Sequence, residues 1–314
     1  MNAPTHAPVA VVDLGSNSIK LLVARRNARG EVVPLHTRTI DARIGAGMAR
    51  ADPVLGEAGM AAAITAVATL LAEAAPHQCG EVAVVATSAV RDARNGGVFA
   101  EKLRAATGHT LRILSGAEEA NLIGRGLTAD PALADQRDFY VFDLGGGSLE
   151  CLAFRERCIV QAVSVQLGCV RLTEQFVSHP QLPFPTGIRT AVENHVVESV
   201  RGAGFDFPLT RPACAIGTGG TVTTARSMLA ARAGRTFAET SADLSITQLR
   251  GIFEQLLPLT LEERCGVPGL PATRADVFPI ALLTLLTLAE VGGFSVYRNS
   301  LYNLRYGLAA EMLP

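Results

Sequence analysis

Two short stretches of the chain place carboxylates beside runs of small residues. The first, VVDLGSNSIK at 11–20, carries Asp13, and the second, VFDLGGGSLE at 141–150, carries Asp143 and Glu150. The stretches align without a gap, and the matched pairs are Asp13 with Asp143, Leu14 with Leu144, Gly15 with Gly145, Ser18 with Ser148 and Leu22 with Leu152. A plain β-turn explains either copy alone, but turn chemistry does not require the same acid before the same turn twice. We therefore interpret the two stretches as copies of one functional unit.

The backbone and the acids of this unit suit different partners. Glycine and other small residues allow successive N–H groups to point into one concavity, which favours a bound anion. A carboxylate beside a bound phosphate would repel it unless a divalent cation lies between them. We predict that Asp13, Asp143 and Glu150 hold Mg²⁺, with Mn²⁺ as the alternative cation, directly or through water. The phosphate-binding residues predicted in the two turns are Ser16, Asn17, Ser18, Gly145, Gly146, Gly147 and Ser148.

A third glycine-rich loop, AIGTGGTVTTAR at 215–226, ends a predicted strand and opens a predicted helix. The N–H groups and the dipole at the start of a helix favour an anion. Turns of this kind are common, so the loop alone is weak evidence. Its position after the second acidic stretch adds Gly219, Gly220 and Thr221 to the predicted phosphate-binding residues.

The hydrophobic pattern predicts the elements that position these residues. Residues 8–44 have the pattern of three strands joined by turns, with NARG as the first hairpin turn. The predicted elements that follow are a helix at about 57–75, a strand at 81–89, a helix in FAEKLRAATG, a strand in TLRIL and a helix from Ser115, where Glu118 completes a capping box. Alternation of strands and helices indicates a parallel part of the sheet.

The second half repeats this opening with three strands, in DFYVFDLGGGS, LECLAFRER and CIVQAVSVQ. Helices then dominate, at about 169–177, 185–202, 220–232, 246–257 and 277–290, with one strand at 213–217. We predict two α/β domains, 1–128 and 129–314, with a cleft between them and a boundary near 128–136. The final helical segment LYNLRYGLAAEML is free to fold back on either domain, including the first.

The composition of the 314 residues excludes several classes of protein. A hydrophobic share of 48% without low-complexity tracts indicates a folded protein, and a net charge of −1 gives no general attraction to nucleic acid or to an anionic membrane. The apolar stretches 59–75 and 276–293 are interrupted by polar residues and are interpreted as core helices. Six cysteines without a C-x-x-C pair indicate reduced thiols, so we expect a cytoplasmic location.

Several motifs occur in an order that resembles one enzyme family. They are VVDLGSNSIKLLVA, ATSAVRDARNG, ILSGAEEANLIGRG, VFDLGGGSLE, GCVRLTEQF, IGTGGTVTTAR and LPATRADVFPIAL. Together they extend from about residue 8 to 308, and they resemble the exopolyphosphatase / guanosine pentaphosphate phosphohydrolase family. This resemblance implies the superfamily of acetate and sugar kinases, Hsp70 and actin, with duplicated ribonuclease H-like domains around a phosphate cleft. It also implies Mg²⁺-dependent removal of a terminal phosphate by water.

The resemblance to this family implies catalytic and binding roles for individual residues. Glu119 is similar to the family's general base, Arg91 to its phosphate clamp, and Asp143 and Glu150 to its organisers of metal and water. A useful base needs burial or a like charge beside it, and we expect Glu118 to supply that charge. The alternative is that both glutamates only favour the helix dipole. The further family matches Arg171, Thr173, Glu174, Arg274 and Asp276 are assigned mainly to packing between the domains.

Two departures from the family pattern concern the substrate. RIGAGM at 43–48 has Ala46 where the family has an acid, and NLRYG at 303–307 has Tyr306 in a changed motif. The chain resembles the short, two-domain form, and we expect a homodimer. The function predicted first is release of terminal phosphate from inorganic polyphosphate. The alternatives are hydrolysis of pppGpp to ppGpp and non-catalytic sensing of guanosine alarmones or polyphosphate. A kinase would need an adenosine site, and a serine hydrolase would need a His beside Ser148.

Overall fold

The computed structural model describes residues 7–210 and 213–314. The chain divides into two compact units, of which the first is Met1–Asp135 together with Tyr302–Pro314 and the second is Gln136–Leu301. The second unit is therefore one continuous segment, whereas the first is completed by residues that follow it in the chain. Each unit has its own buried apolar core.

The first unit is built on a five-stranded sheet in the order β3-β2-β1-β4-β5. β2 is antiparallel to both β1 and β3, and β4 and β5 continue the sheet on the other side of β1, parallel to it. The strands are β1 Val9–Leu14, β2 Ser18–Arg26, β3 Val32–Asp41, β4 Glu81–Ala86 and β5 Leu111–Ile113. All six residues of β1 are buried, as expected for a central strand that is covered on both faces.

Helices cover this sheet on two sides. The helices are α1 Glu57–Ala74, α2 Ser88–Arg91, α3 Gly96–Thr107, α4 Gly116–Thr128 and α11 Leu304–Met312, with short 3₁₀ turns at Ala75–His77 and Pro131–Leu133. The segment Glu57–His77 is long and apolar enough to cross a membrane by length and composition alone. Its buried residues recur at helical spacing and pack on β1 and β2, so it is a core helix here, as predicted.

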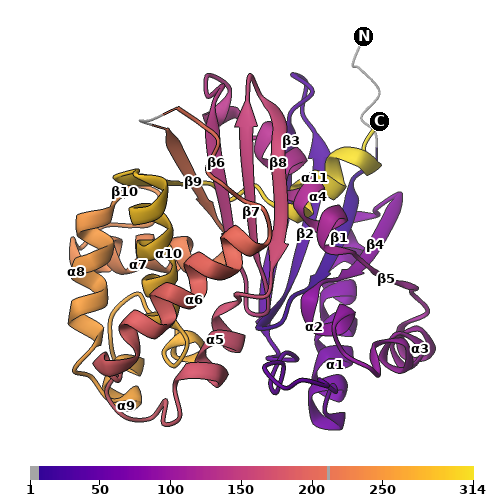
Figure 1. Ribbon diagram of the computed structural model, residues 1–314. Coiled ribbons are helices and arrows are strands. Elements are labelled where there is room, and N and C mark those ends of the chain that lie inside the picture. Colours follow the sequence, from indigo (N-terminus) through magenta and orange to yellow (C-terminus); the bar gives the residue numbers. More distant parts are fainter. Residues whose placement is uncertain (1–6, 211–212) are drawn as a thin grey trace. The chain divides into compact units, whose positions relative to one another are not determined.

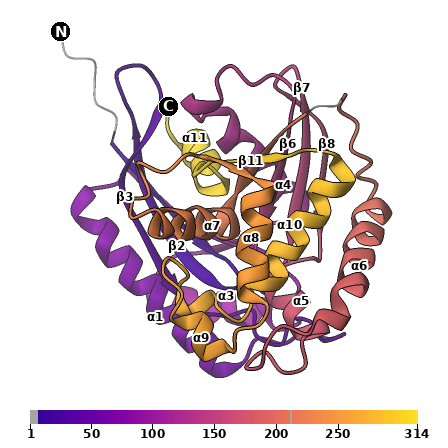
Figure 2. The same ribbon diagram turned by 90° about the vertical axis from the view of Figure 1, so that its left-hand side faces the viewer.

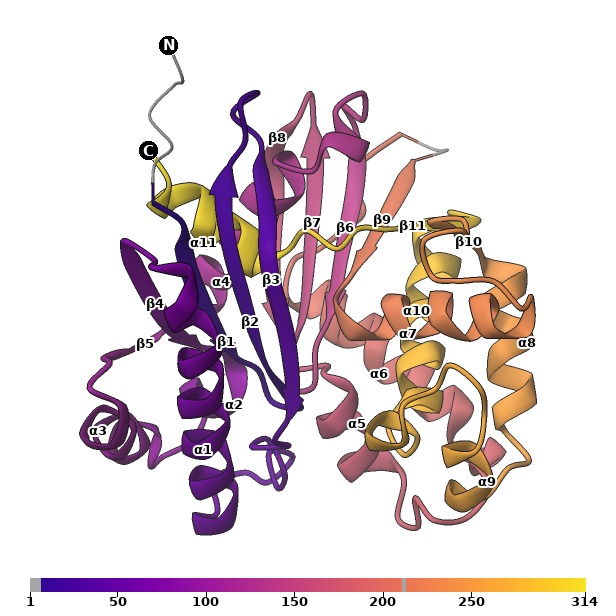
Figure 3. The same ribbon diagram turned by 180° about the vertical axis from the view of Figure 1, so that it is seen from behind.

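The last helix, α11, lies beside α4 and also packs on β1 and β2 (Figures 1 and 3). Glycines make this approach possible. A Cβ atom at Gly126 of α4 would overlap the carbonyl oxygen of Asn303, and one at Gly307 of α11 would overlap that of Leu122. The two backbones are therefore in direct contact, and neither helix has room for a side chain at the crossing.

The second unit repeats the sheet of the first. Its order is β10-β11-β9-β6-β7-β8, so β8-β7-β6-β9-β11 corresponds to β3-β2-β1-β4-β5, and β10 is added at one edge. The strands are β6 Phe139–Leu144, β7 Leu149–Arg155, β8 Cys158–Val165, β9 Cys214–Thr218, β10 Asp243–Ser245 and β11 Val296–Asn299. Again three antiparallel strands are followed by strands parallel to the first. The predicted fold class, a duplicated ribonuclease H-like α/β domain, is confirmed.

The helices of the second unit gather around α10, which is buried on almost every side. They are α5 Cys169–Phe176, α6 Arg189–Gly202, α7 Gly219–Arg232, α8 Ile246–Leu256, α9 Leu261–Cys265 and α10 Phe278–Gly292, with 3₁₀ turns at Thr186–Ile188 and Ala272–Arg274. Figure 2 shows α10 between α6 and α8, and it also packs on α5 and α7. The apolar stretch 276–293 is thus a core helix, as predicted. The short strands β10 and β11 and helix α9 were not predicted.

Candidate functional site

The repeated acidic stretches form the same turn in both units. In the first unit the backbone N–H of Gly15 donates to the carbonyl of Ser18 at 3.2 Å, and in the second the N–H of Gly145 donates to the carbonyl of Ser148 at 3.0 Å. Each turn joins the central strand of its sheet to the next antiparallel strand. The sequence repeat is therefore also a structural repeat.

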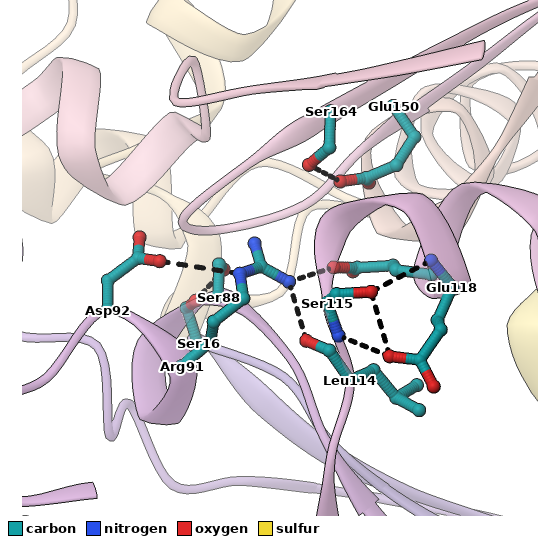
Figure 4. A network of polar contacts seen from close by, with 10 residues as sticks. Ser16, Ser88, Arg91, Asp92, Leu114, Ser115, Glu118, Glu150 and Ser164 are labelled. Atoms are coloured by element: carbon teal, nitrogen blue, oxygen red, sulfur yellow. Dashed lines mark hydrogen bonds and ion pairs between the residues drawn. The ribbon is translucent and has the colours of Figure 1, made fainter.

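In the first unit, the segment 43–45 holds the turn from one side. Its backbone N–H groups donate to the carbonyls of Ser16 at 2.8 Å and Asn17 at 3.0 Å. Because the C=O and N–H of a trans peptide point in opposite directions, the N–H groups of Asn17 and Ser18 point away from that segment. The Ser16 hydroxyl lies 3.0 Å from the Ser88 hydroxyl of α2 (Figure 4). The turn thus directs adjacent donors to one side, which is the arrangement that binds an anion.

Asp13 lies beside this turn and is only 9% exposed. Burial raises the pKa of its carboxyl, while the charges of Lys20 and Arg305 oppose that rise. Its Oδ1 atom and both side-chain atoms of Asn17 are buried and have no hydrogen-bond partner among the described residues. A buried carboxylate oxygen without a partner is costly unless a cation or a bound water satisfies it. Asp13 therefore fits the predicted role of a ligand for Mg²⁺.

The predicted base and the predicted phosphate clamp are in direct contact within the first unit. Arg91 Nη1 donates to Glu119 Oε2 at 2.7 Å and to the carbonyl of Leu114 at 3.1 Å, and its Nε lies 3.4 Å from Asp92 Oδ1. The Glu119 side chain is 8% exposed. The Glu119 carboxyl group is thus held by a guanidinium and is largely screened from solvent, which fixes its position as a candidate proton acceptor.

The structure corrects the role expected for Glu118. Glu118 accepts hydrogen bonds from the backbone and hydroxyl of Ser115, both at 2.8 Å, and from Arg112 at 2.9 Å. These bonds, with the Ser115 backbone first, lower the pKa of Glu118 to about 2. Adjacent helix residues do not face each other. Glu118 therefore completes the predicted capping box, and Arg91 dominates the surroundings of Glu119.

Glu118→Gln is expected to lower the free energy of unfolding by about 1 kcal/mol at pH 7, because the charged cap of α4 is weakened. The folded pKa of about 2 lies below the unfolded value of 4.5, so the contribution is complete above pH 4.5. It disappears as the pH falls toward 2. Urea unfolding of both proteins between pH 7 and pH 3 measures the difference. A difference that grows on acidification would contradict the assignment.

In the second unit, helix α5 holds the turn 145–148. The first backbone N–H groups of α5 donate to the carbonyls of Gly145 and Gly146 at 2.9 Å each, and Arg171 Nε donates to the carbonyl of Gly147 at 3.1 Å. By the same peptide geometry, the N–H groups that follow these carbonyls point away from α5. Helix α5 thus binds the carbonyl groups of this turn, as the segment 43–45 binds those of the turn in the first unit. Both turns therefore direct their amide donors to one side.

The sequence did not identify two residues that support this turn. Arg171 was assigned mainly to packing between the domains, and the structure adds that it is buried and bonds to the turn of its own unit. Gly168 was not singled out at all. A Cβ atom at Gly168 would overlap the backbone of Gly146 and Gly147, so only glycine allows α5 to approach the turn this closely. The family motif GCVRLTEQF contains both residues.

The predicted acids of the second unit are neighbours on adjacent strands. Asp143 and Glu150 are cross-strand partners in β6 and β7. Glu150 is 2% exposed and accepts a hydrogen bond of 2.8 Å from the Ser164 hydroxyl (Figure 4). Asp143 lies against the third glycine loop, since a Cβ atom at Gly219 would overlap its Oδ1 atom. The sequence-predicted acids, the second turn and the third loop are thus brought together within one unit.

The third loop starts α7 in the predicted way. Gly219 has φ +81°, which favours glycine, and the Thr221 hydroxyl bonds to the carbonyl of Leu144 at 3.4 Å. The guanidinium of Arg274 lies directly over Gly220, where a Cβ atom would overlap it. Arg274 was assigned to packing between the domains, but it lies at this loop, and its Nε is buried without a hydrogen-bond partner among the described residues.

Among residues 7–210 and 213–314, no three His, Cys, Asp or Glu side chains form a group that could hold a metal ion by themselves. Magnesium does not need such a cage. It commonly binds through one or two carboxylates and completes its shell with water and substrate phosphates. The adjacent Asp143 and Glu150 in one unit and the buried Asp13 in the other are donors of that kind. The residues present therefore fit a phosphate-associated Mg²⁺ ion.

Comparison with known proteins agrees with this chemistry. Residues 22–314 match the model of the Ppx/GppA phosphatase family. The chain belongs to the Ppx/GppA phosphatase family. It is 34% identical to exopolyphosphatase 2 of Mycobacterium tuberculosis over 97% of this chain and 98% of that protein. It is 27% identical to the guanosine-5′-triphosphate,3′-diphosphate pyrophosphatase of Vibrio vulnificus over 99% of this chain, which spans 60% of that longer protein.

Solved structures of Ppx/GppA proteins have the same fold. An exopolyphosphatase from Cytophaga hutchinsonii superposes with a TM-score of 0.88 over 98% of this chain and 99% of its own, at 22% identity. The Ppx/GppA enzyme of Aquifex aeolicus gives a TM-score of 0.77 over 98% of this chain and all of its own, also at 22% identity. At these identities the similarity establishes the fold alone.

Proposed function

We propose that this Ppx/GppA family member is an exopolyphosphatase, which releases terminal phosphate from inorganic polyphosphate by hydrolysis. The observation that carries the proposal is the contact between Arg91 and the buried side chain of Glu119. This pair belongs to the same unit as the first anion-binding turn, to which α2 is linked through the Ser16 and Ser88 hydroxyls. A base, a cation and a set of amide donors are the groups that phosphoryl transfer to water requires. The 34% identity to a named exopolyphosphatase supports the same conclusion.

In the proposed reaction, a water oxygen attacks the terminal phosphorus. Glu119 accepts a proton from that water, the new P–O bond forms, and the bond to the bridging oxygen breaks, so that orthophosphate and a chain shorter by one unit are released. Within the first unit, Arg91 and the N–H groups of the turn at 15–18 are the groups proposed to bind phosphate oxygens. Within the second unit, these groups are Arg274, the N–H groups of the turn at 145–148 and the start of α7.

We propose Asp13 in the first unit, and Asp143 with Glu150 in the second, as residues that take part in holding Mg²⁺, or Mn²⁺ in its place. When bound, the cation would supply neutralisation of the phosphate charge. Phosphate release should therefore stop when the divalent cation is removed with EDTA and return when Mg²⁺ is added in excess. Full turnover in EDTA would contradict this assignment of the acids.

Hydrolysis of pppGpp to ppGpp is the second candidate, because the Vibrio vulnificus relative named for a guanosine pyrophosphatase matches 99% of this chain. Both reactions use the same base and phosphate turns. A non-catalytic sensor of guanosine alarmones or polyphosphate would bind without turnover. The presence of Glu119 beside Arg91 favours an enzyme, since binding alone does not need a base.

The deciding experiment measures phosphate release by the purified protein with Mg²⁺ from short polyphosphate, long polyphosphate and pppGpp side by side. Turnover of polyphosphate above that of pppGpp supports the exopolyphosphatase. Faster turnover of pppGpp supports the second candidate. Binding of all three without phosphate release would leave only the sensor.

A homodimer and a cytoplasmic location remain proposals for this protein. All six cysteines are free thiols in the structure, which suits a reducing compartment. Light scattering after gel filtration measures the mass of the assembly, and the proposed dimer predicts twice the mass of the 32.9 kDa chain.

A further inference from the structure

The second unit has a surface hollow that none of the predicted phosphate-binding residues lines. Its volume is about 450 Å³, and the residues that line it belong to the end of α7, strand β10, the start of α8 and the segments beside them. Helix α7 begins at the third glycine loop and has 14 residues. Because a helix rises about 1.5 Å per residue, the hollow lies about 20 Å from that loop. It is therefore a separate feature of the second unit.

The wall of the hollow between α7 and β10 is held in one conformation. Arg226 donates to the carbonyl of Thr240 twice, from Nε at 3.1 Å and from Nη2 at 2.6 Å, and its guanidinium lies 4.2 Å from the ring centroid of Phe237. The backbone N–H and the hydroxyl of Thr236 donate to Glu239 at 2.9 and 2.8 Å. Two independent sets of bonds thus fix this segment before any ligand binds, which lowers the entropic cost of binding.

The strong acceptors at the hollow are already engaged. Asp243 accepts two hydrogen bonds from Arg298, at 2.7 and 3.1 Å, and these bonds lower the pKa of its carboxyl. The Oε1 atom of Gln248 accepts from the backbone N–H of Ser245 at 2.8 Å in the capping box of α8. A ligand that donates hydrogen bonds, or a cation, therefore competes at these two side chains with Arg298 and with the capping bonds of α8.

Donors and positive charge remain available. Within the part of the chain that the structure describes, the Arg235 guanidinium has no hydrogen-bond or ion-pair partner, and Arg232 bonds only through Nη2 to Gln255. The amide nitrogen of Gln248 is likewise unused there. The Asp243 charge is balanced by Arg298, so Arg232 and Arg235 give the hollow an excess of two positive charges. An anion is the ligand that this set of groups favours.

The floor of the hollow adds an apolar contact surface, which is contributed by the accessible side chains of Leu229 and Ala233. Guanidinium groups bind phosphate oxygens in a bidentate way. An inorganic ion would leave the apolar floor unused, and the volume is in the range of sites for small organic ligands. We infer that this hollow binds an organic phosphate of about the size of a nucleoside monophosphate, with its phosphate on Arg232 and Arg235 and its organic part on the floor.

Adenosine 5′-monophosphate is a suitable probe, with adenosine and orthophosphate as partial ligands. We expect the nucleotide to bind, adenosine not to bind, and orthophosphate to bind more weakly. Hydrogen exchange of the protein with the nucleotide should show protection at 229–248. The double variant Arg232→Gln/Arg235→Gln should weaken binding by more than about tenfold, because two charge-assisted contacts are lost. Arg201→Gln removes an exposed arginine of the same unit on α6 and should leave binding unchanged.

Three results would overturn the inference. The first is no saturable binding of the nucleotide at millimolar concentration. The second is binding that the double variant retains, with protection at 15–18, 145–148 or 219–221, since the nucleotide would then occupy the predicted phosphate turns. The third is orthophosphate binding as tightly as the nucleotide, which would leave the floor without a role. None of these measurements depends on phosphate release, so the inference fails or stands separately from the proposed activity.

Discussion

Glu119→Gln is expected to lower the rate of phosphate release by about 10² to 10⁴-fold, because an amide cannot accept the proton of the attacking water. The substitution keeps the size of the side chain and an oxygen that can accept from Arg91 at the present 2.7 Å position. Substrate binding should therefore change little, and the loss should appear in kcat more than in KM. Steady-state phosphate release with the preferred substrate measures both constants.

The matched control for this variant is the neighbouring Glu118→Gln. It removes the same charge from the same helical turn, but its side chain caps α4 and pairs with Arg112 instead of contacting Arg91. We expect it to retain the rate of phosphate release and to lose only stability. Equal rates in Glu119→Gln and the parent protein would disprove the role of Glu119 as base. Equal losses in both variants would indicate a general effect of charge on α4.

Gly126→Ala is expected to destabilise the first unit by about 3 kcal/mol or more, since backbone atoms cannot move aside as a side chain can. The added Cβ atom would overlap the carbonyl oxygen of Asn303, and α11 would have to leave α4. Gly307→Ala should have a similar effect from the other side of the crossing, where the obstacle is Leu122. Thermal unfolding measures the loss, and hydrogen exchange at 304–312 shows whether α11 has separated.

Gly97→Ala serves as the control for the helix crossing. Gly97 lies near the start of α3 in the same unit, and a Cβ atom there would meet nothing within 4 Å. Alanine should be neutral or stabilising there, because it is the better helix former. If Gly126→Ala and Gly97→Ala unfold at the same temperature, the two helices are not in the contact described.

The three antiparallel strands of each unit, β1–β3 and β6–β8, were predictable because they are long and their sequence pattern occurs twice. The acidic stretches around Asp13 and Asp143 identified the two central strands, and their alternating neighbours gave the antiparallel pairs. The capping box at Ser115 and the glycines that begin α7 could also be predicted, because each feature depends on residues close in sequence. Strands β10 and β11 were not predicted because each has only three or four residues and their pairing is with distant segments.

Parts of the candidate site depend on contacts that a sequence does not contain. The motif around Glu119 indicated a candidate base but not its contact with Arg91, because Arg91 is distant in the chain and Glu118 turns the other way. Arg171 and Arg274 belonged to recognised motifs, yet their position beside glycine carbonyls and Gly220 follows from tertiary packing. A signal was present in the glycines, since Gly168 and Gly220 mark places where another group occupies the space of a side chain.

The first unit consists of two segments of the chain, and this affects the order in which its parts leave the ribosome. Its last helix, α11, is encoded after the whole of Gln136–Leu301. A ribosome therefore exposes the sheet and α4 of the first unit long before the helix that packs on them exists, whereas the second unit can fold as one uninterrupted piece. Until α11 has been made, the surface that receives it is uncovered, so a chaperone would be expected to bind the nascent chain there.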